Sequence, residues 1–303
     1  MRHIIESQQF SQETLFELFK KADELKTLSE PLLNNKIMAS LFYEPSTRTR
    51  LSFESAMLKL GGKVIGTENA REFSSAIKGE SLEDSIRVIS KYVDCIVIRH
   101  SEEGSAKNAA KISTVPIINA GDGKGQHPTQ ALLDVYTLYK EFGRINNLKI
   151  AMVGDLSSGR TVRSLCYLLA KFKDIEIIFV SPENLKMQED IKDYLNKKGI
   201  IFREEYNLNK ILPEVDIIYM TRIQKERMNI EDYEKAAGKY VINMENLNLI
   251  KKESRVMHPL PHVEEIQLPI DIEEKDPRIA YFRQAENGLY IRMALLDMIL
   301  NNK

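Results

Sequence analysis

Short apolar runs alternate with segments of helical periodicity along this chain, and the alternation restricts the fold more than any other feature of the sequence. The runs typical of buried strands include one that ends before Gly154 and those at residues 93–98, 115–120, 175–180, 216–221 and 240–244. Segments such as 11–28, 187–198 and 230–237 place apolar residues at helical spacing. This order predicts an α/β fold in which parallel sheets are covered by helices on both faces.

The chain has 303 residues, of which 43% are hydrophobic and 29% are charged. Because a single core rarely grows to that length, the sequence predicts two doubly wound domains. The polar, turn-rich segment 142–147 is the expected boundary, which gives domains of residues 1–142 and 143–286. A helix over 287–300 is apolar nearly all around, so we expect residues 287–303 to pack back on the first domain.

Composition excludes several classes of function. The net charge of −1 leaves no broad basic surface for nucleic acid or an anionic membrane. No apolar stretch approaches the ~20 residues that span a bilayer, and the N-terminus lacks a long apolar core, so we expect a cytoplasmic protein. Cys95 and Cys166 lie inside apolar runs, which is typical of small buried side chains. A catalytic thiol is the alternative, but no suitable histidine lies nearby in sequence.

Residues Phe42–Gly62 read as a strand, a tight turn and a helix. The turn places Ser46, Thr47 and Thr49 at the first helical turn, where free backbone N–H groups and the positive end of the helix dipole attract anions. Arg48 lies beside them. The sequence therefore predicts a phosphate site, although an ordinary N-cap followed by arginines on a solvated face is also open.

Two further strands of the first half end in polar residues. The run 93–98 is followed by Arg99, which suits either an anion or a structural salt bridge. The run 115–120 is followed by a glycine-rich segment that leads to His127 and Gln130 at the start of a helix. A histidine in that place is often a helix cap or a surface residue. Neither a P-loop nor a dinucleotide fingerprint matches the glycine spacing.

Three strands of the second half also end in candidate binding residues. Arg160 begins a helix after the turn at Gly154, where an anion site and a nucleotide-binding turn are both conceivable. Only Gly154 and Gly159 occupy that turn, so the dinucleotide fingerprint is incomplete. Arg222 and Gln224 follow the run 216–221 in a segment rich in cations, which would ordinarily be a solvated loop. The turn 258–261 contains two prolines that fix the backbone, so the carbonyls of Pro259 and Leu260 can be presented rigidly.

Together these motifs resemble those of the aspartate and ornithine carbamoyltransferases. The segment STRTR at 46–50 is similar to the family's carbamoyl-phosphate signature, and Ser74 with Lys78, HPTQ, TRIQ and HPLP follow in the family's order. On chemistry alone Ser74 and Lys78 would mark a surface turn. In the family the matching pair reaches the active site of a neighbouring subunit, so the resemblance implies a homotrimer with shared sites.

The resemblance implies roles for residues at these matching positions. Those expected to bind carbamoyl phosphate are Ser46, Thr47, Arg48, Thr49, Ser74, Lys78, Arg99, His127, Gln130, Pro259 and Leu260. Those expected to bind the amino-acid substrate are Lys78, Arg160, Arg222, Gln224 and Leu260. Catalysis would fall to Arg48, Thr49, Arg99, His127 and Lys78, without a covalent intermediate, a metal or a cofactor.

Residue chemistry favours aspartate as the second substrate. Guanidinium groups at Arg222 and its neighbours would repel the cationic side chain of ornithine, and ornithine-specific members carry cysteine where Pro259 stands. The implied reaction joins carbamoyl phosphate to L-aspartate, giving N-carbamoyl-L-aspartate and phosphate, the committed step of pyrimidine biosynthesis. His262 departs from the arginine common in the family, and we assign it no role.

Several alternatives stay open at this point. A carbamoyltransferase specific for ornithine or a related amine is the nearest, and a non-catalytic anion or nucleotide sensor is the alternative from another class. Members of the family occur as trimers alone or as trimers paired with separate regulatory chains, and the TRIQKER form of this sequence looks more like the group with regulatory chains. The proposal requires the few cations of a nearly neutral chain to gather between the two domains.

Overall fold

The computed structural model describes residues 2–70, 79–223 and 238–301, which divide into two compact units. The first unit comprises Met1–Tyr136 with Glu286–Lys303, and the second comprises Thr137–Ala285. Two helices contribute to both units, α6 (Pro128–Phe142) and α12 (Tyr281–Asn301). Within the described residues, no helix is both long and apolar enough to cross a membrane.

The first unit contains a parallel four-stranded sheet in the order β2-β1-β3-β4. Its strands are β1 (Ile37–Phe42), β2 (Lys63–Glu68), β3 (Cys95–His100) and β4 (Ile117–Asp122). Its helices, besides α6 and α12, are α1 (Gln12–Glu24), α2 (Thr47–Lys59), α4 (Leu82–Ile89) and α5 (Ser105–Ile112). The strand β3 continues through Arg99, which the sequence had placed just after it.

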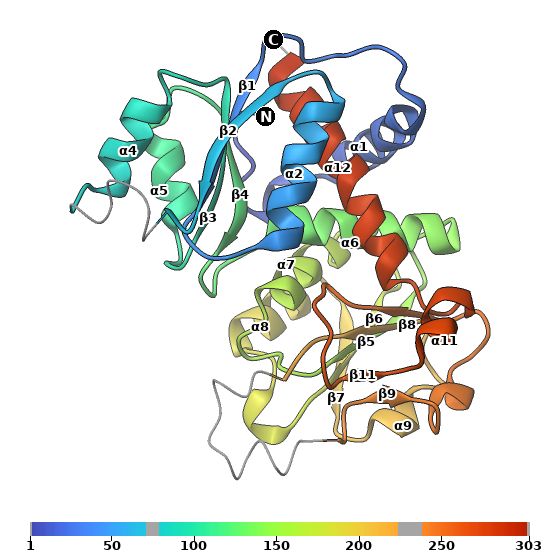
Figure 1. Ribbon diagram of the computed structural model, residues 1–303. Coiled ribbons are helices and arrows are strands. Elements are labelled where there is room, and N and C mark those ends of the chain that lie inside the picture. Colours follow the sequence, from blue (N-terminus) through green and yellow to red (C-terminus); the bar gives the residue numbers. More distant parts are fainter. Residues whose placement is uncertain (1, 71–78, 224–237, 302–303) are drawn as a thin grey trace. The chain divides into compact units, whose positions relative to one another are not determined.

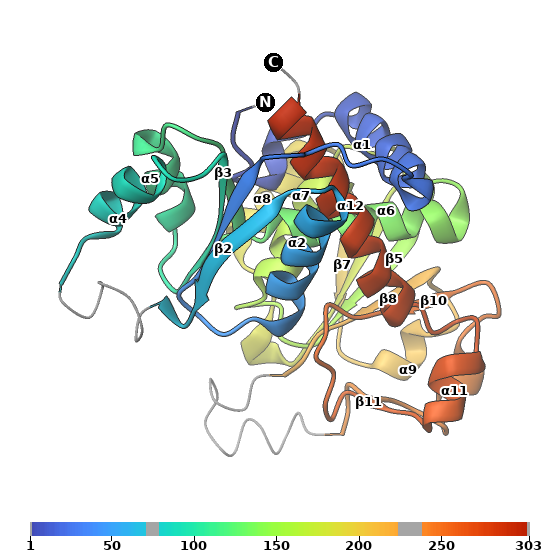
Figure 2. The same cartoon turned by 45° about the horizontal axis from the view of Figure 1, so that its top comes forward.

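Helices cover both faces of this sheet, as the sequence predicted. Figures 1 and 2 show α4 and α5 on one face, where Ile86 and Ala106 pack with Ala39 and Ile96 of the strands. The other face carries α2, and Ser40 of β1 donates a hydrogen bond to Glu54 of that helix over 2.9 Å. Successive strand residues therefore point to opposite, covered faces, which explains the unbroken apolar runs.

The second unit contains a parallel five-stranded sheet in the order β10-β8-β5-β6-β7. Its strands are β5 (Lys149–Val153), β6 (Glu176–Val180), β7 (Ile201–Glu205), β8 (Ile217–Met220) and β10 (Arg255–Met257). Its helices, besides α6 and α12, are α7 (Arg160–Leu169), α8 (Glu189–Lys197), α9 (Leu208–Ile211) and α11 (Ile270–Lys275).

Both faces of the second sheet are covered as well. In Figure 1, α7 and α8 lie on one face and α9 on the other. The buried thiol of Cys166 on α7 lies 3.6 Å from the sulfur of Met152 on β5. Leu208 and Ile211 of α9 instead pack with Ala151, the neighbour of Met152 along β5. Cys166 thus has the packing role that its apolar surroundings predicted, and the thiol of Cys95 is likewise buried.

Two predictions for the second unit differ from the structure. The expected strand at 240–244 is only β9 (Ile242–Asn243), which pairs with β11 (Ile266–Gln267) in a separate two-stranded sheet. The strand β7 was not predicted, because its residues IFREE are mostly charged, as suits the edge of a sheet. The helix expected at 230–237 lies outside the described residues.

The last helix packs on the first unit, as the sequence predicted. Its carboxylate at Asp297 lies 2.8 Å from the ammonium of Lys21 on α1, and Asn301 donates to the carbonyl of Leu32 over 3.3 Å. The helix begins at Tyr281, earlier than its expected start at residue 287. The extra turn carries charged residues such as Arg283, which hide the apolar periodicity.

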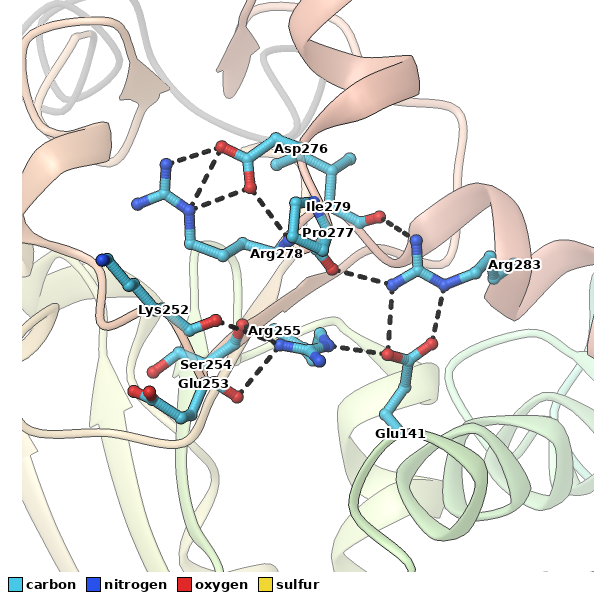
Figure 3. Close-up of polar contacts among 10 residues, drawn as sticks. All are labelled: Glu141, Lys252, Glu253, Ser254, Arg255, Asp276, Pro277, Arg278, Ile279 and Arg283. Carbon is cyan, nitrogen blue, oxygen red and sulfur yellow. Dashed lines mark hydrogen bonds and ion pairs between the residues drawn. The ribbon is translucent and has the colours of Figure 1, made fainter.

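An ion-pair network in the second unit fixes the start of β10 (Figure 3). Glu141 accepts from Arg255 of β10 over 2.6 Å and from Arg283 of α12 over 2.7 Å. Arg283 also donates to the carbonyl of Ile279 over 2.8 Å, and Arg255 donates to that of Ser254 over 2.9 Å. Burial alone raises the pKa of Glu141, but the hydrogen bonds from Arg283 and Arg255 outweigh it and lower the pKa.

Candidate functional site

In the first unit, the predicted residues that the structure describes lie at the carboxyl edge of the sheet. The strand order reverses between β1 and β3, which in open α/β sheets marks the position of ligand sites. Arg99 at the end of β3 pairs in register with Phe42, the last residue of β1, and α2 begins five residues later at Thr47. His127 follows β4, the next strand along. The fold thus brings these segments to one edge.

The first turn of α2 is unusual for an ordinary helix start. Ser46 is the N-cap, yet its side chain makes no capping hydrogen bond, and the first turn holds no acidic residue. Thr49 is buried, whereas Arg48 is exposed. The capping hydrogen bond and the acidic residue that stabilise an ordinary helix start are therefore both missing. Arg48 instead adds positive charge at the positive end of the helix dipole.

The second arginine of STRTR has a different environment from the first. Arg50 lies 2.9 Å from Glu68 of β2 and 3.4 Å from Glu54 on its own helix. These carboxylates neutralise its charge and tie α2 to the edge strand. Arg50 is therefore a structural residue, although the sequence motif gives it the same prominence as Arg48.

His127 is buried, with 4% of its surface exposed, so it is not the surface residue that its place before a helix also allowed. Its Nε2 lies 3.5 Å from the hydroxyl of Thr49, and its Nδ1 lies 3.4 Å from the hydroxyl of Thr129. Gln130, also buried, donates from Nε2 to Asp134 over 2.9 Å. Three predicted residues, Thr49, His127 and Gln130, thus belong to one packed polar group.

Carboxylates organise the remaining segments at this edge. The Nε of Arg99 lies 3.3 Å from Glu44, in the turn between β1 and α2. Buried Asp122 accepts from the backbone N–H of Gly104 and of Gln126, each over 2.9 Å. It thereby holds the loop that leads to His127. Of the two roles predicted for Arg99, the salt bridge is present. Its place at the carboxyl edge of the sheet is also the one expected for an anion site.

In the second unit, the predicted residues within the described part of the chain again lie at the carboxyl edge of the sheet. The strand order reverses between β5 and β8. Arg160 is the first residue of α7, which follows β5, and Arg222 follows β8 by two residues. Both side chains are partly exposed. Asp155 accepts from the N–H of Ser158 over 3.0 Å and orders the turn that precedes Arg160.

Gly154 has a structural explanation. Its φ is +114°, and a Cβ there would lie 2.2 Å from the carbonyl oxygen of Thr221 at the end of β8. Thr221 in turn donates its N–H to the carbonyl of Val153 over 2.8 Å. Glycine is required for this close approach of two strand ends, so the residue does not by itself indicate a nucleotide-binding turn.

The turn 258–261 is held by a buried pair, His258 and Glu265. The Nδ1 of His258 accepts from the N–H of Leu260 over 2.7 Å, and its Nε2 donates to Glu265 over 2.8 Å. Leu260 has a positive φ of 55°, which costs a branched residue energy and needs such support. Burial alone raises the pKa of Glu265, but the hydrogen bond from His258 and backbone donors outweigh it, so the pKa is lowered.

His262 has structural contacts. Its Nε2 lies 3.1 Å from Glu273, which also accepts a hydrogen bond from the hydroxyl of Tyr281. The rings of His262 and Tyr281 are 5.2 Å apart. The predicted site residues Ser74, Lys78 and Gln224 lie outside the described residues. Among residues 2–70, 79–223 and 238–301, no group of three or more His, Cys, Asp or Glu side chains could hold a metal ion.

Sequence reasoning missed the carboxylates that support the predicted residues. Glu44 pairs with Arg99, Asp134 holds Gln130, and Glu265 supports the turn at Leu260 through His258. The spacing of four residues between Gln130 and Asp134, on a predicted helix, was a usable signal. The other two pairs join a side chain to a segment whose position only the fold determines.

Comparison with known proteins gives matches over both units. Residues 2–140 match the model of the carbamoyl-P binding domain of aspartate/ornithine carbamoyltransferases, and residues 146–299 match that of the Asp/Orn binding domain. Aspartate carbamoyltransferase 3, chloroplastic, from Pisum sativum is 55% identical over 304 residues, covering 98% of this chain and 77% of that protein.

Solved structures of similar proteins agree with the fold. The catalytic subunit of aspartate transcarbamoylase from M. jannaschii has a TM-score of 0.91 at 46% identity, covering 99% of this chain and 98% of that one. Aspartate transcarbamoylase from Trypanosoma cruzi, in complex with carbamoyl aspartate and phosphate, has a TM-score of 0.92 at 36% identity, covering 99% and 96%. The two doubly wound units with parallel sheets are confirmed by this likeness.

Proposed function

Because this chain belongs to the aspartate/ornithine carbamoyltransferase family, we propose that it transfers the carbamoyl group of carbamoyl phosphate to the amine of L-aspartate. The products are N-carbamoyl-L-aspartate and phosphate, and the reaction is the committed step of pyrimidine biosynthesis. The observation that carries the proposal is the group formed by Thr49, His127 and Gln130 beside the cationic start of α2.

The first unit binds carbamoyl phosphate in this proposal. Ser46, Thr47 and Arg48 at the start of α2 take the phosphate, since backbone N–H groups and the helix dipole favour a dianion there. Thr49, Arg99 and His127 donate to the carbamoyl oxygen as the amine attacks and negative charge develops on it. Gln130 accepts from the carbamoyl amide, and the phosphate leaves onto the same cations.

The second unit binds L-aspartate. Arg160 and Arg222, in the segments that follow the adjacent strands β5 and β8, supply two guanidinium groups for two carboxylates. The carbonyls of Pro259 and Leu260 accept from amino groups of the ligands, with the turn held by His258. Gln224 is assigned to aspartate by its place in the motif. Carbamoyl phosphate is a dianion and aspartate carries two carboxylates, so these local cations offset a repulsion that the net charge of −1 does not.

The assembly and location follow the family resemblance. We assign the protein as a cytoplasmic homotrimer in which Ser74 and Lys78 complete the site of a neighbouring subunit, whereas the relative from Pisum sativum is named chloroplastic. Sedimentation of the full chain tests the trimer. Mixing an inactive Lys78→Ala chain with an inactive Arg48→Ala chain tests sharing, because mixed trimers regain activity only if one site takes residues from two chains.

The substrate is tested by measuring phosphate release from carbamoyl phosphate with L-aspartate and with L-ornithine in parallel. We expect release with aspartate and none above background with ornithine, since Arg222 repels a cationic side chain. Release with ornithine alone would assign the chain to the other branch of the family. Binding of carbamoyl phosphate without consumption in the presence of either amine would favour a non-catalytic sensor.

A further inference from the structure

Asp134 is a buried carboxylate for which the proposed mechanism gives no role. It lies on α6, one turn after Gln130, and none of its surface is exposed. Its Oδ1 accepts from Nε2 of Gln130 over 2.9 Å. A buried carboxylate is costly unless it is paired, so its presence one turn from a site residue calls for an explanation.

Arg292 on α12 lies near enough to Asp134 for the charge of that carboxylate to act on its pKa. Arg292 is buried, and its guanidinium carbon lies 5.1 Å from the ring centroid of Phe53 on α2. Burial lowers the pKa of Arg292 to about 10, against the opposing effect of the Asp134 charge. Gly288 makes room for this guanidinium, because a Cβ at that position would lie 2.5 Å from its Nη1.

The pairing fixes which end of the Gln130 amide can meet a ligand. Asp134 accepts this hydrogen bond, so the amide of Gln130 presents its NH₂ group to the carboxyl group. The carbonyl oxygen of Gln130 is then the end left for a ligand, and it can only accept. A ligand group that carries an N–H donor therefore gains a hydrogen bond at Gln130, and a methyl group of similar size does not.

We propose that Asp134 is a positioning residue, which orients Gln130 through this hydrogen bond so that the site selects a transferred group bearing an N–H donor. In terms of substrates, Asp134 makes the site prefer carbamoyl phosphate to acetyl phosphate, in which a methyl group replaces the amine. This inference rests on the proposed function of the first unit and assigns a determinant of its specificity.

The test compares the KM for carbamoyl phosphate with the inhibition constant of acetyl phosphate against it, both in the presence of L-aspartate. Because the two compounds carry the same phosphate, general damage to the phosphate site changes both constants alike, so it does not change the ratio of the inhibition constant to the KM. We expect Asp134→Asn to lower the preference for carbamoyl phosphate about tenfold. The amide of the substituted side chain can also donate a hydrogen bond, which allows the side-chain amide of Gln130 to flip. A ratio equal to that of the unaltered protein would overturn the proposal.

A matched control separates this effect from the general loss of a buried carboxylate. Asp297 is also buried in the first unit and pairs with Lys21 over 2.8 Å. Asp297→Asn should leave the ratio unchanged, and an equal fall in both variants would show a merely structural role. In a Gln130→Met background, Asp134→Asn should change the ratio no further. If the fold-changes of the two single substitutions instead multiply in the double variant, the two residues act independently and the assignment is wrong.

If Asp134→Asn does not fold, Gln130→Met alone is decisive, because it leaves Asp134 and Arg292 in place. The proposal requires about a tenfold fall in the ratio for that variant, and an unchanged ratio overturns it. The unaltered chain distinguishes the two levels of inference. If it fails to consume carbamoyl phosphate with L-aspartate, the proposed function is wrong. If it is active but the substitutions leave the ratio unchanged, only the role of Asp134 is wrong.

Discussion

The carboxyl edges of the two sheets carry polar residues of different character. In the first unit Thr49, His127 and Gln130 are buried and lie in contact with one another or with Asp134. In the second unit Arg160 and Arg222 are partly exposed, and the buried polar pair there, His258 with Glu265, holds backbone at Leu260.

The difference in burial suits the two edges to different tasks, transition-state stabilisation in the first unit and substrate recognition in the second. Buried, mutually oriented donors cost little to rearrange during reaction, so they suit the stabilisation of charge that develops in the transition state. Partly exposed guanidinium groups suit the recognition of a charged substrate, and they bind the ground state and the transition state alike. We therefore expect first-unit variants to lower kcat and second-unit variants to raise the KM for aspartate.

The largest effect is expected for Arg48→Ala. Although Arg48 is exposed, it meets the charge that develops on the leaving phosphate, so its loss should lower turnover of carbamoyl phosphate about a thousandfold, or about 4 kcal/mol in the activation free energy. Steady-state kinetics at saturating aspartate measures it. Arg50→Ala is the matched control, since Arg50 pairs with Glu54 and Glu68, and its kcat should change less than about threefold. Near-normal turnover in Arg48→Ala would refute the phosphate assignment.

The contrast between Arg48 and Arg50 also shows what the sequence could and could not predict. Strand and helix alternation predicted both parallel sheets, because fully covered strands are apolar throughout. It missed β7, whose charges reflect an edge position, and it overestimated the strand at 240–244. A local pattern records burial well, but it does not record which strand pairs with which.

The same limit applies to the sites. From sequence, Arg99 and Arg222 were placed at strand ends, and His127 and Arg160 at the starts of the helices that follow two other strands. The rule that parallel strands share a carboxyl edge then assigned the residues of each unit to one edge. Their supporting carboxylates were not predicted, because a partner such as Glu265 is identifiable only when the fold has brought it to His258.

The next effect in size concerns Arg222. Arg222→Ala should raise the KM for aspartate about a hundredfold while kcat falls less than about threefold, because it removes ground-state binding of a carboxylate. Initial rates over a range of aspartate concentrations measure both values. If the variant lowers kcat as strongly as Arg48→Ala does, the division of tasks between the two edges is wrong.

A smaller effect is expected when the support of the turn is removed. Glu265→Ala leaves the Nε2–H of His258 buried without its acceptor and lets Leu260 shift, so the KM for aspartate should rise about tenfold. Glu265→Gln keeps an acceptor oxygen and should change it less than about threefold. Equal effects of the two substitutions would show that the turn depends on the charge of Glu265 rather than on the hydrogen bond.

The smallest effect on catalysis is expected at Glu141, whose network lies at Arg255, the first residue of β10, rather than at the strand's carboxyl end. Its pKa is held below the ordinary 4.5, so the stability it contributes is complete above that pH and is lost as the pH falls further. The unaltered protein should therefore unfold at a higher temperature than Glu141→Gln at neutral pH, and the difference should shrink in acid below pH 4.5. The KM for aspartate at neutral pH should be the same in both. A difference in unfolding temperature that persists undiminished in acid would show that packing, not the charge of Glu141, stabilises this end of the sheet.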